Sequence, residues 1–275
     1  MKRFLLVLCI ILNMGNLAWA QTAPPLGTTA TFAVLGSSNV TCTAPGVISG
    51  DVGVSPGVFT NTTGCIVAGT VHQDDSAASN ALTALNTAYQ NALAANSSCT
   101  SFLAAAPSTS FTLPPGVYCN TGAAPALTLT TITLTLDAGG NANAVWIFKI
   151  DAALTATAFK VVMANGGQPC NVYWLVGGDS TLTASTFQGN ILAGGPTGSF
   201  TSTDGTLIGR VLANGAVTMT RPNVHGTCAL AAQGGAGCTN DDDDRDKDKD
   251  HHHKDKDKDK DKDKDKDHQD DGHKD

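Results

Sequence analysis

Short runs of alternating apolar and hydroxyl side chains repeat along the second half of the chain. The clearest pair is 154–159 (LTATAF) and 182–187 (LTASTF), and looser versions lie at 203–207 and 220–224. Each run stands near a second apolar segment, for example residues 190–193 (NILA). A strand-like unit that recurs at loose spacing is typical of a solenoid, in which each coil stacks on the previous one.

The alternation predicts which side chains face the interior. In residues 154–157 the leucine and the alanine point inward and the two threonines point outward, so this wall of the solenoid is half-exposed. The pattern slips at 158–159 and at 186–187, where we expect a corner or a bulge.

Three other segments are read as strong strands, at 126–136, 144–150 and 171–176. The last two are almost continuously apolar, which is typical of strands covered on both faces. We therefore place these two in a wall that another element covers.

One segment, about residues 74–95, has the periodicity of a helix. Its apolar residues recur at intervals of three and four: Ala78, Leu82, Leu85, Tyr89 and Leu93. We place Asp74 and Asp75 in its first turn, where the helix dipole favours negative charge. A single helix in a β chain must bury its apolar stripe against the stack. The predicted fold is therefore mainly β: an irregular right-handed β-solenoid with one long α-helix packed along one wall.

The chain divides into three parts. Residues 1–20 have the charged start, short apolar centre and small-residue cleavage site of a signal peptide, so we expect secretion. Residues 21–238 are predicted to form one domain, and the Asp/Lys/His-rich residues 239–275 to be a disordered tail. The apolar run of the signal is too short to span a bilayer and no later segment is longer, so we expect no membrane insertion.

The predicted domain has a nearly neutral surface. It contains no glutamate, and its few charged residues are scattered. Such a surface lacks the basic stripe that nucleic-acid binding needs and the basic amphipathic face used at membranes. We expect no nucleic-acid partner and a monomeric protein.

The cysteines of an exported chain are expected to form disulfides. No CxxC pair is present, which argues against a zinc ribbon or a thioredoxin-type site. Our preferred pairing leaves Cys238 over, although sequence alone leaves other connectivities open. The preferred pairs are Cys42–Cys65, Cys99–Cys119 and Cys170–Cys228.

An enzymatic reading is not favoured. Solenoid lyases and hydrolases of polysaccharides use clustered carboxylates. The aspartates here stand singly in turn-like surroundings, where the side chain accepts hydrogen bonds from local backbone groups. They are Asp137, Asp151, Asp179 and Asp204. We expect no catalytic residue, no cofactor and no metal site.

The exposed threonines are the positive signal. Neighbouring strands lie roughly 4.7–4.9 Å apart and alternate residues of one strand roughly 6.5–7 Å apart, so a threonine wall is a grid of hydroxyls and methyls. Threonine is stiff at its first side-chain torsion, so such a grid is rigid. A rigid grid can order water into an ice-compatible layer. The alternative is that threonine is simply a good residue for an exposed strand.

A resemblance to a known family favours the first interpretation. The segments that carry it are 32–36, 48–57, 69–72, 113–118, 134–138, 143–150, 170–174 and 209–218. In these segments the chain resembles the microbial ice-binding (antifreeze) proteins. The resemblance implies a discontinuous β-solenoid with one adjacent long helix, uneven coils, and an N-terminal part packed among the later coils.

The resemblance also implies a site on one flat wall, in some members with a Thr-Ala/Gly-x-Thr/Asn motif. Residues 183–186 match that motif in full. The copy at 155–158 lacks the last polar residue, and those at 203–206 and 220–223 carry a charge at the second position. The ice-binding residues expected on this basis are Thr130, Thr133, Thr155, Thr157, Thr183, Ser185, Thr186, Thr203, Thr206, Thr218, Thr220 and Asn223.

The function so predicted is that of a secreted ice-binding protein, whose partner is the surface of an ice crystal. It would inhibit ice growth and recrystallisation. Outward charges at Asp204 and Arg221 would weaken this activity. The alternative is an extracellular adhesive or polysaccharide-binding module that uses the same wall.

Overall fold

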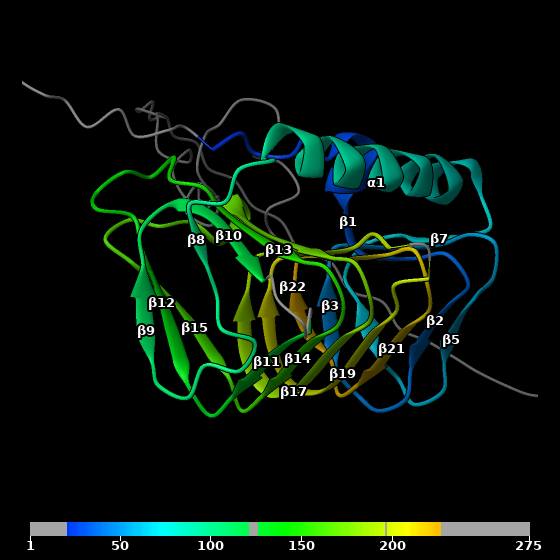
Figure 1. The fold of residues 1–275 in the computed structure, drawn as a ribbon. Helices are drawn as coiled ribbons and strands as arrows, with labels where there is room; N and C mark the ends of the chain where they lie inside the picture. Colours follow the sequence, from blue (N-terminus) through cyan, green and yellow to red (C-terminus); the bar gives the residue numbers. More distant parts are fainter. Residues whose placement is uncertain (1–20, 121–125, 196, 227–275) are drawn as a thin grey trace, which may run out of the picture. The chain divides into compact units, whose positions relative to one another are not determined.

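A computed structural model describes residues 21–120, 126–195 and 197–226 of the chain. The predicted signal peptide and tail, together with Cys228 and Cys238, lie outside the described residues. Within them the chain forms two sheets whose paired strands all run parallel, and one long helix (Figure 1). The prediction of a mainly β fold with parallel stacking and one helix is confirmed. Its right-handed winding stays a prediction.

The first sheet has nine strands, one from each coil. In stacking order they are β7 (Val71–Gln73), β4 (Asp51–Val54), β1 (Phe32–Gly36), β20 (Val211–Ala213), β18 (Asn190–Ala193), β16 (Val172–Val176), β13 (Trp146–Ile150), β10 (Gly116–Asn120) and β8 (Ser101–Phe102). The apolar runs predicted at 144–150 and 171–176 supply β13 and β16, which are buried on both faces as expected.

The second sheet has thirteen strands and bends into two walls, because β17 (Ser180–Gln188) and β19 (Phe200–Ile208) each turn a corner midway. Their first halves continue a wall formed by β5 (Val58–Asn61), β2 (Asn39–Cys42), β21 (Val217–Thr220), β14 (Leu154–Thr157) and β11 (Leu127–Thr130). Their second halves continue a wall formed by β6 (Ile66–Val67), β3 (Val47–Ser49), β22 (Asn223–His225), β15 (Lys160–Ala164), β12 (Thr133–Asp137) and β9 (Phe111–Leu113).

The coils do not stack in chain order. β1 pairs with β20 and β2 pairs with β21, so the N-terminal coils continue the stack beyond the C-terminal one. Residues at opposite ends of the sequence therefore become neighbours on every wall. The N-terminal part, expected among the later coils, therefore contacts the last of them from one end of the stack.

The interior of the coils contains an aromatic stack. The rings of Phe148 and Trp174 lie 3.9 Å apart with an interplanar angle of 10°, Tyr118 stacks on the other side of Phe148, and Phe187 tilts against Trp174. Tyr118, Phe148 and Trp174 come from three successive coils, so the stack ties these coils together through the core. Burial raises the pKa of Tyr118 to about 12, and its hydroxyl donates to the Pro114 carbonyl oxygen at 2.6 Å.

Helix α1 (Ser76–Ala95) lies on the nine-stranded sheet (Figure 1). Its buried side chains, among them Leu82, Leu85 and Tyr89, share a second apolar cluster with residues of that sheet and of the short helix η1 (Gly27–Thr31). The sheet thus has a core on each face, which explains its continuously apolar strands.

The helix begins slightly later than expected. Asp75 is the N-cap, and its side chain accepts from the backbone N–H of Ala78 at 2.8 Å. Asp74 precedes the cap in a left-handed conformation, so neither aspartate lies in the first turn. The reason is that a carboxylate satisfies the free N–H groups best from the cap position itself.

Two predictions of strand geometry are corrected. Residues 126–136 do not form one strand, because the chain turns at Thr131 (φ 53°) between β11 and β12. The corner expected at 186–187 lies instead at Ala184 (φ 48°), whereas the one expected at 158–159 is present at Ala158 (φ 47°). A residue in the left-handed conformation turns the chain without changing the pattern of apolar and polar residues. The alternation in the sequence therefore located these corners only approximately.

The predicted disulfides Cys42–Cys65 and Cys99–Cys119 are confirmed. Cys170 also forms a disulfide, and its predicted partner Cys228 lies outside the described residues. A short helix, η2 (Pro169–Asn171), places Cys170 just before β16.

The buried residue Arg210 ties η1 to the nine-stranded sheet. Its Nε donates to the Ala30 carbonyl oxygen and its Nη1 donates to the Asn190 side chain.

Candidate functional site

The wall that contains β11, β14 and β21 presents two straight rows of threonine. In these three strands every second side chain is buried and the intervening one is a threonine that faces outward. The first row contains seven threonines in register on adjacent coils: Thr128, Thr155, Thr181, Thr201, Thr218, Thr41 and Thr60.

The second row lies two residues further along each coil. Register pairs Thr130, Thr157, Thr183, Thr203 and Thr220. The row continues past the ends of β2 and β5: Thr43 N donates to the Met219 carbonyl oxygen at 2.9 Å, and Thr62 N to that of Cys42 at 3.2 Å. The Thr43 and Thr220 hydroxyl oxygens lie 2.8 Å apart. We call the two rows together the threonine wall.

The dimensions of the threonine wall follow from the sheet. A step between coils is about 4.8 Å and the two rows lie about 6.7 Å apart, so the six steps of each row span about 29 Å. Each threonine is restricted at its first torsion by branching at Cβ and by the same residue above and below it. The result is a long, narrow and uncharged grid of hydroxyl and methyl groups.

The adjoining wall, built from β9, β12, β15, β22, β3, β6 and the second halves of β17 and β19, has no such repeat. We call it the mixed wall. Its outward residues nearest the corner, in register order, are Thr133, Lys160, Thr186, Thr206, Asn223, Val47 and Ile66. The next row contains Thr135, Val162, Gln188, Ile208 and His225. Charged, apolar, amide and hydroxyl groups alternate along it.

A row of left-handed residues separates the two walls. The same corner on successive coils is occupied by residues with φ between 47° and 59°: Thr131, Ala158, Ala184, Asp204 and Arg221.

Two of these corner residues, Asp204 and Arg221, form a two-point ion pair. Arg221 Nε donates to Asp204 Oδ1, and Arg221 Nη2 donates to Asp204 Oδ2. Hydrogen bonding to Arg221 lowers the pKa of Asp204 below its ordinary 3.8, and the pKa of Arg221 is raised in return.

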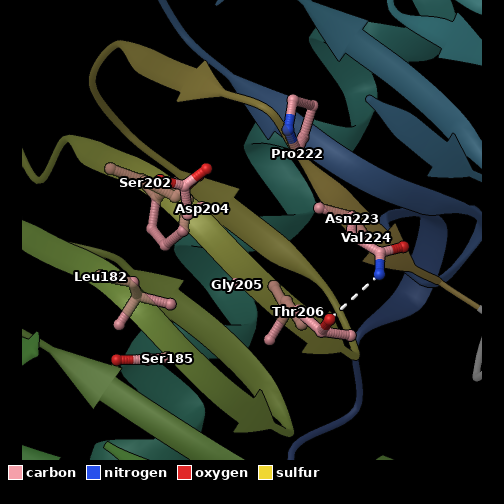
Figure 2. A pocket seen from close by; sticks show the side chains of 11 residues that line it. Leu182, Ser185, Ser202, Asp204, Gly205, Thr206, Pro222, Asn223 and Val224 are labelled. Carbon is pink, nitrogen blue, oxygen red and sulfur yellow. Dashed lines mark hydrogen bonds between the residues drawn. The ribbon is translucent and has the colours of Figure 1, made fainter. Parts of the chain in front are cut away.

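A shallow hollow lies at this corner between the coils of β17, β19 and β22 (Figure 2). Ser202, Asp204 and Gly205 line one side and Pro222 and Asn223 another. A hydrogen bond of 3.0 Å from the Asn223 amide to the Thr206 hydroxyl crosses its mixed-wall side (Figure 2). Buried residues next to the corner, among them Leu182, Ser185 and Phe200, complete the lining.

The structure divides the predicted site residues between the two walls. Seven of them belong to the threonine wall: Thr130, Thr155, Thr157, Thr183, Thr203, Thr218 and Thr220. Four lie on the mixed wall: Thr133, Thr186, Thr206 and Asn223. The motif at 183–186 does not lie flat, because the corner at Ala184 turns the chain between its two outer threonines.

Ser185 does not belong to either exposed row. Its side chain points inward and is 3% exposed. The hydroxyl donates to the Thr183 carbonyl oxygen at 2.9 Å and accepts from the backbone N–H of Phe159 at 3.2 Å. Its inclusion in the predicted site is therefore wrong, because the alternation of facing is reset by the corner one residue earlier.

Seven threonines of the wall escaped the sequence prediction: Thr41, Thr43, Thr60, Thr62, Thr128, Thr181 and Thr201. A usable signal existed, since each of the seven coils that form the rows contributes a Thr-x-Thr triplet, from 41–43 to 218–220. The four-residue motif at 183–186 spans the corner, whereas the Thr-x-Thr triplet lies within the strand before it.

The isolated aspartates satisfy local groups. Asp137 accepts from the backbone N–H of Gly139 and from the Asn165 amide, and these two bonds lower its pKa. Asp179 accepts from the backbone N–H of Ser199 at 2.9 Å. Among the described residues no group of three or more His, Cys, Asp or Glu side chains is placed to hold a metal.

Comparison with known proteins identifies the family. A family model described as ice-binding-like matches residues 34–225, which include both walls and the helix. The chain belongs to the ice-binding-like family. A relative named ice-binding protein, from Nostoc sp. (strain HG1), is 37% identical over 243 residues, covering 84% of this chain and 86% of the relative.

Solved structures of family members have the same fold. An ice-binding protein from the Antarctic ascomycete Antarctomyces psychrotrophicus superimposes with a TM-score of 0.64 at 28% identity, covering 74% of this chain and 98% of that one. A glycosylated ice-binding protein from an Arctic yeast gives a TM-score of 0.66 at 26% identity, covering 74% and 94%. Each of these three relatives is named for ice binding.

Proposed function

We propose that this protein binds ice through the threonine wall and thereby inhibits ice growth and recrystallisation. The observation that carries the proposal is the uninterrupted register of threonine in both rows. Membership of the ice-binding-like family supports it independently.

The chemistry of the wall suits a surface of ordered water. Threonine methyls restrict the orientation of first-shell water, and the hydroxyls between them hydrogen-bond it at fixed intervals. Waters held between two polar surfaces are enthalpically nearly as good as direct hydrogen bonds. Because the threonines are already restricted, little side-chain entropy is lost when the water layer merges with ice.

The fold accounts for rigidity of the grid. The inward side chains of the same strands, such as Leu154, Ala156 and Leu182, belong to the main core. Backbone hydrogen bonds between coils fix the interval between neighbouring threonines. A bound crystal plane therefore meets a preformed surface, which lowers the entropic cost of adsorption.

We further propose that the protein is secreted and acts as a monomer. The signal peptide predicted at residues 1–20 and the disulfides favour secretion, which would bring the protein into contact with extracellular ice. Among the described residues no helix has the length and hydropathy needed to cross a membrane. The proposed activity involves no reaction and no cofactor, and we propose that a monomer suffices, since the rows are complete within one chain.

A matched pair of variants tests the proposal. Thr183→Tyr places a bulky ring in the middle of the second row, whereas Thr186→Tyr places the same ring on the mixed wall of the same coil. We expect Thr183→Tyr to raise the concentration needed for recrystallisation inhibition by roughly tenfold or more, because the ring holds the wall away from ice. Thr186→Tyr should change it little.

Circular dichroism and the melting temperature serve as folding controls, and both variants should retain the wild-type values. Equal activity of Thr183→Tyr and the wild-type protein would refute the threonine wall as the site. Absence of any shaping of single ice crystals by the wild-type protein, together with retention on a polysaccharide column, would instead support the adhesive alternative.

A further inference from the structure

We propose that the Asp204–Arg221 ion pair neutralises the edge of the threonine wall, so that the row beside it stays compatible with ice-like water. The inference rests on the proposed function of the wall. It concerns two residues that immediately follow the second-row threonines Thr203 and Thr220.

The position of the pair is set by the corner. All five corner residues adopt the left-handed conformation, and three of them are small or hydroxyl-bearing: Thr131, Ala158 and Ala184. Aspartate tolerates this conformation better than most residues, whereas arginine has no such preference. Arg221 is therefore not explained by backbone preference, which directs attention to what its side chain does.

The side chain of Arg221 is committed to Asp204. Register places Thr203 beside Thr220, so the residues that follow them are neighbours on adjacent coils. The guanidinium donates to both carboxylate oxygens, the second contact measuring 2.7 Å. The Arg221 side chain is 56% exposed and the Asp204 side chain is 41% exposed, so the pair lies at the surface next to the second row.

An exposed ion pair contributes little to stability, commonly between zero and about 1 kcal/mol. The same two coils are already held by backbone pairing and, on the mixed wall, by the Asn223–Thr206 hydrogen bond. Cross-linking the coils is thus a minor role for the pair.

The pairing matters more for the hydration of the two charged groups than for the stability of the fold. A free carboxylate or guanidinium orders water around its own charge, in an arrangement that a neutral hydroxyl and methyl grid does not share. Two-point pairing occupies oxygens and N–H groups that would otherwise bind that water. Within the two threonine rows no charged residue occurs, and Asp204 and Arg221 stand one residue beyond the second row.

This assignment predicts a non-additive pattern among three variants. Arg221→Ala leaves an unpaired carboxylate beside Thr203, and Asp204→Ala leaves an unpaired guanidinium beside Thr220. Each should raise the endpoint concentration for recrystallisation inhibition by about two- to fivefold, comparable with the loss of an exposed charge interaction. Asp204→Ala with Arg221→Ala, which copies the uncharged corner at Ala158 and Ala184, should return the endpoint to the wild-type value or below it.

Arg221→Lys, which keeps the charge but not the two-point geometry, should give an intermediate endpoint. All four variants should keep a melting temperature within about 3 °C of the wild type. Thr183→Tyr is measured in parallel as a test of the wall itself.

The pattern separates the possible results. Single and double variants that all match the wild type, with Thr183→Tyr inactive, would overturn the role of the pair and leave the wall intact as the site. A double variant worse than either single variant would also overturn it and indicate direct contact of the pair with ice. If Thr183→Tyr retains full activity, the failure belongs to the proposed function rather than to this inference.

Discussion

The threonine wall and the mixed wall are built by the same coils and meet at one corner, yet only the threonine wall repeats one outward residue type from coil to coil. Both have buried apolar residues on the inner side, parallel neighbours and the same interval between strands. If strand preference alone chose the exposed residues, both walls would show the same mixture. One is all threonine and the other includes Lys160, Gln188 and His225.

This difference supports the proposal that the threonine rows serve a requirement beyond folding. The mixed wall proves that the fold tolerates varied side chains at equivalent outward positions. We take the uniformity of the other wall as support for that proposal, because a repeating crystal surface would require identical groups at fixed intervals.

Exchanging residues across the corner of one coil should have the largest effect. Thr157→Lys places the charge of the mixed wall on the threonine wall, and Lys160→Thr makes the reverse change. We expect Thr157→Lys to weaken ice-growth inhibition by roughly tenfold or more, because a hydrated ammonium interrupts the second row. Lys160→Thr should change it less than about twofold.

Thermal hysteresis measured at matched concentration distinguishes these outcomes, with circular dichroism as the folding control. Similar losses from both changes would mean that the two walls act as one surface, and the contrast drawn above would fail.

Removing the Cys42–Cys65 disulfide should affect the end of the threonine wall formed by Thr41, Thr43, Thr60 and Thr62. The bridge closes a loop across a sequence separation of 23 residues, for which chain entropy predicts about 3 kcal/mol of unfolding free energy. We expect the Cys42→Ala, Cys65→Ala protein to lose about that much in denaturant unfolding and part of its ice activity.

The matched control is the Cys99→Ala, Cys119→Ala protein. That bridge joins β10 to the segment before β8, in the nine-stranded sheet, across a separation of 20 residues. Its removal should cost a similar free energy but less ice activity. The reverse ranking of activities would argue against a contribution of the N-terminal coils to the site.

The loss of ice activity caused by a Thr→Tyr substitution should depend on the position of the threonine along its row. Thr201→Tyr lies in the middle of the first row and Thr60→Tyr in its last coil. A ring in the middle lifts the wall on both sides, whereas a ring at the end leaves most of the row in contact. We expect a loss of roughly tenfold for Thr201→Tyr and about two- to threefold for Thr60→Tyr. Equal losses would indicate that only a local patch binds.

The smallest effect is expected from pH. The threonine rows contain no titrating group, so ice activity should be the same at pH 5 and pH 8.

The stability of the fold should fall only at acid pH. The pKa of Asp75 is lowered from 3.8, first by the hydrogen bond from the backbone N–H of Ala78 and then by His72. Its contribution to stability is therefore present above pH 3.8 and is lost as the pH falls through the lowered pKa.

Melting temperatures between pH 8 and pH 2 test this prediction. The Asp75→Asn protein, which retains a capping side chain without the charge, should show a smaller fall at acid pH. A melting temperature that falls between pH 8 and pH 5 would show that groups other than the paired aspartates control stability.

Much of the fold follows from local patterns in the sequence. The three- and four-residue spacing from Ala78 to Leu93 is enough to predict the helix, and the continuous apolar runs predict β13 and β16. The alternation at 154–157 predicts which threonines face outward. These features are readable because each depends on neighbours within a few residues along the chain.

The site was harder to predict because it depends on where the corners fall. A residue in the left-handed conformation, such as Ala184, turns the chain and resets the alternation, which buries Ser185 and moves Thr186 to another wall. Alanine at such a position gives no sequence warning, unlike glycine.

The sequence by itself therefore determined the threonines, their alternation with apolar residues and the family to which the chain belongs. Only the tertiary structure decided that they form two continuous rows, because register between coils is set by stacking and corner geometry. It also decided that Thr41 and Thr60, from the N-terminal coils, extend the row of Thr218. Residues so far apart in sequence become neighbours only when the first coils pair with the last.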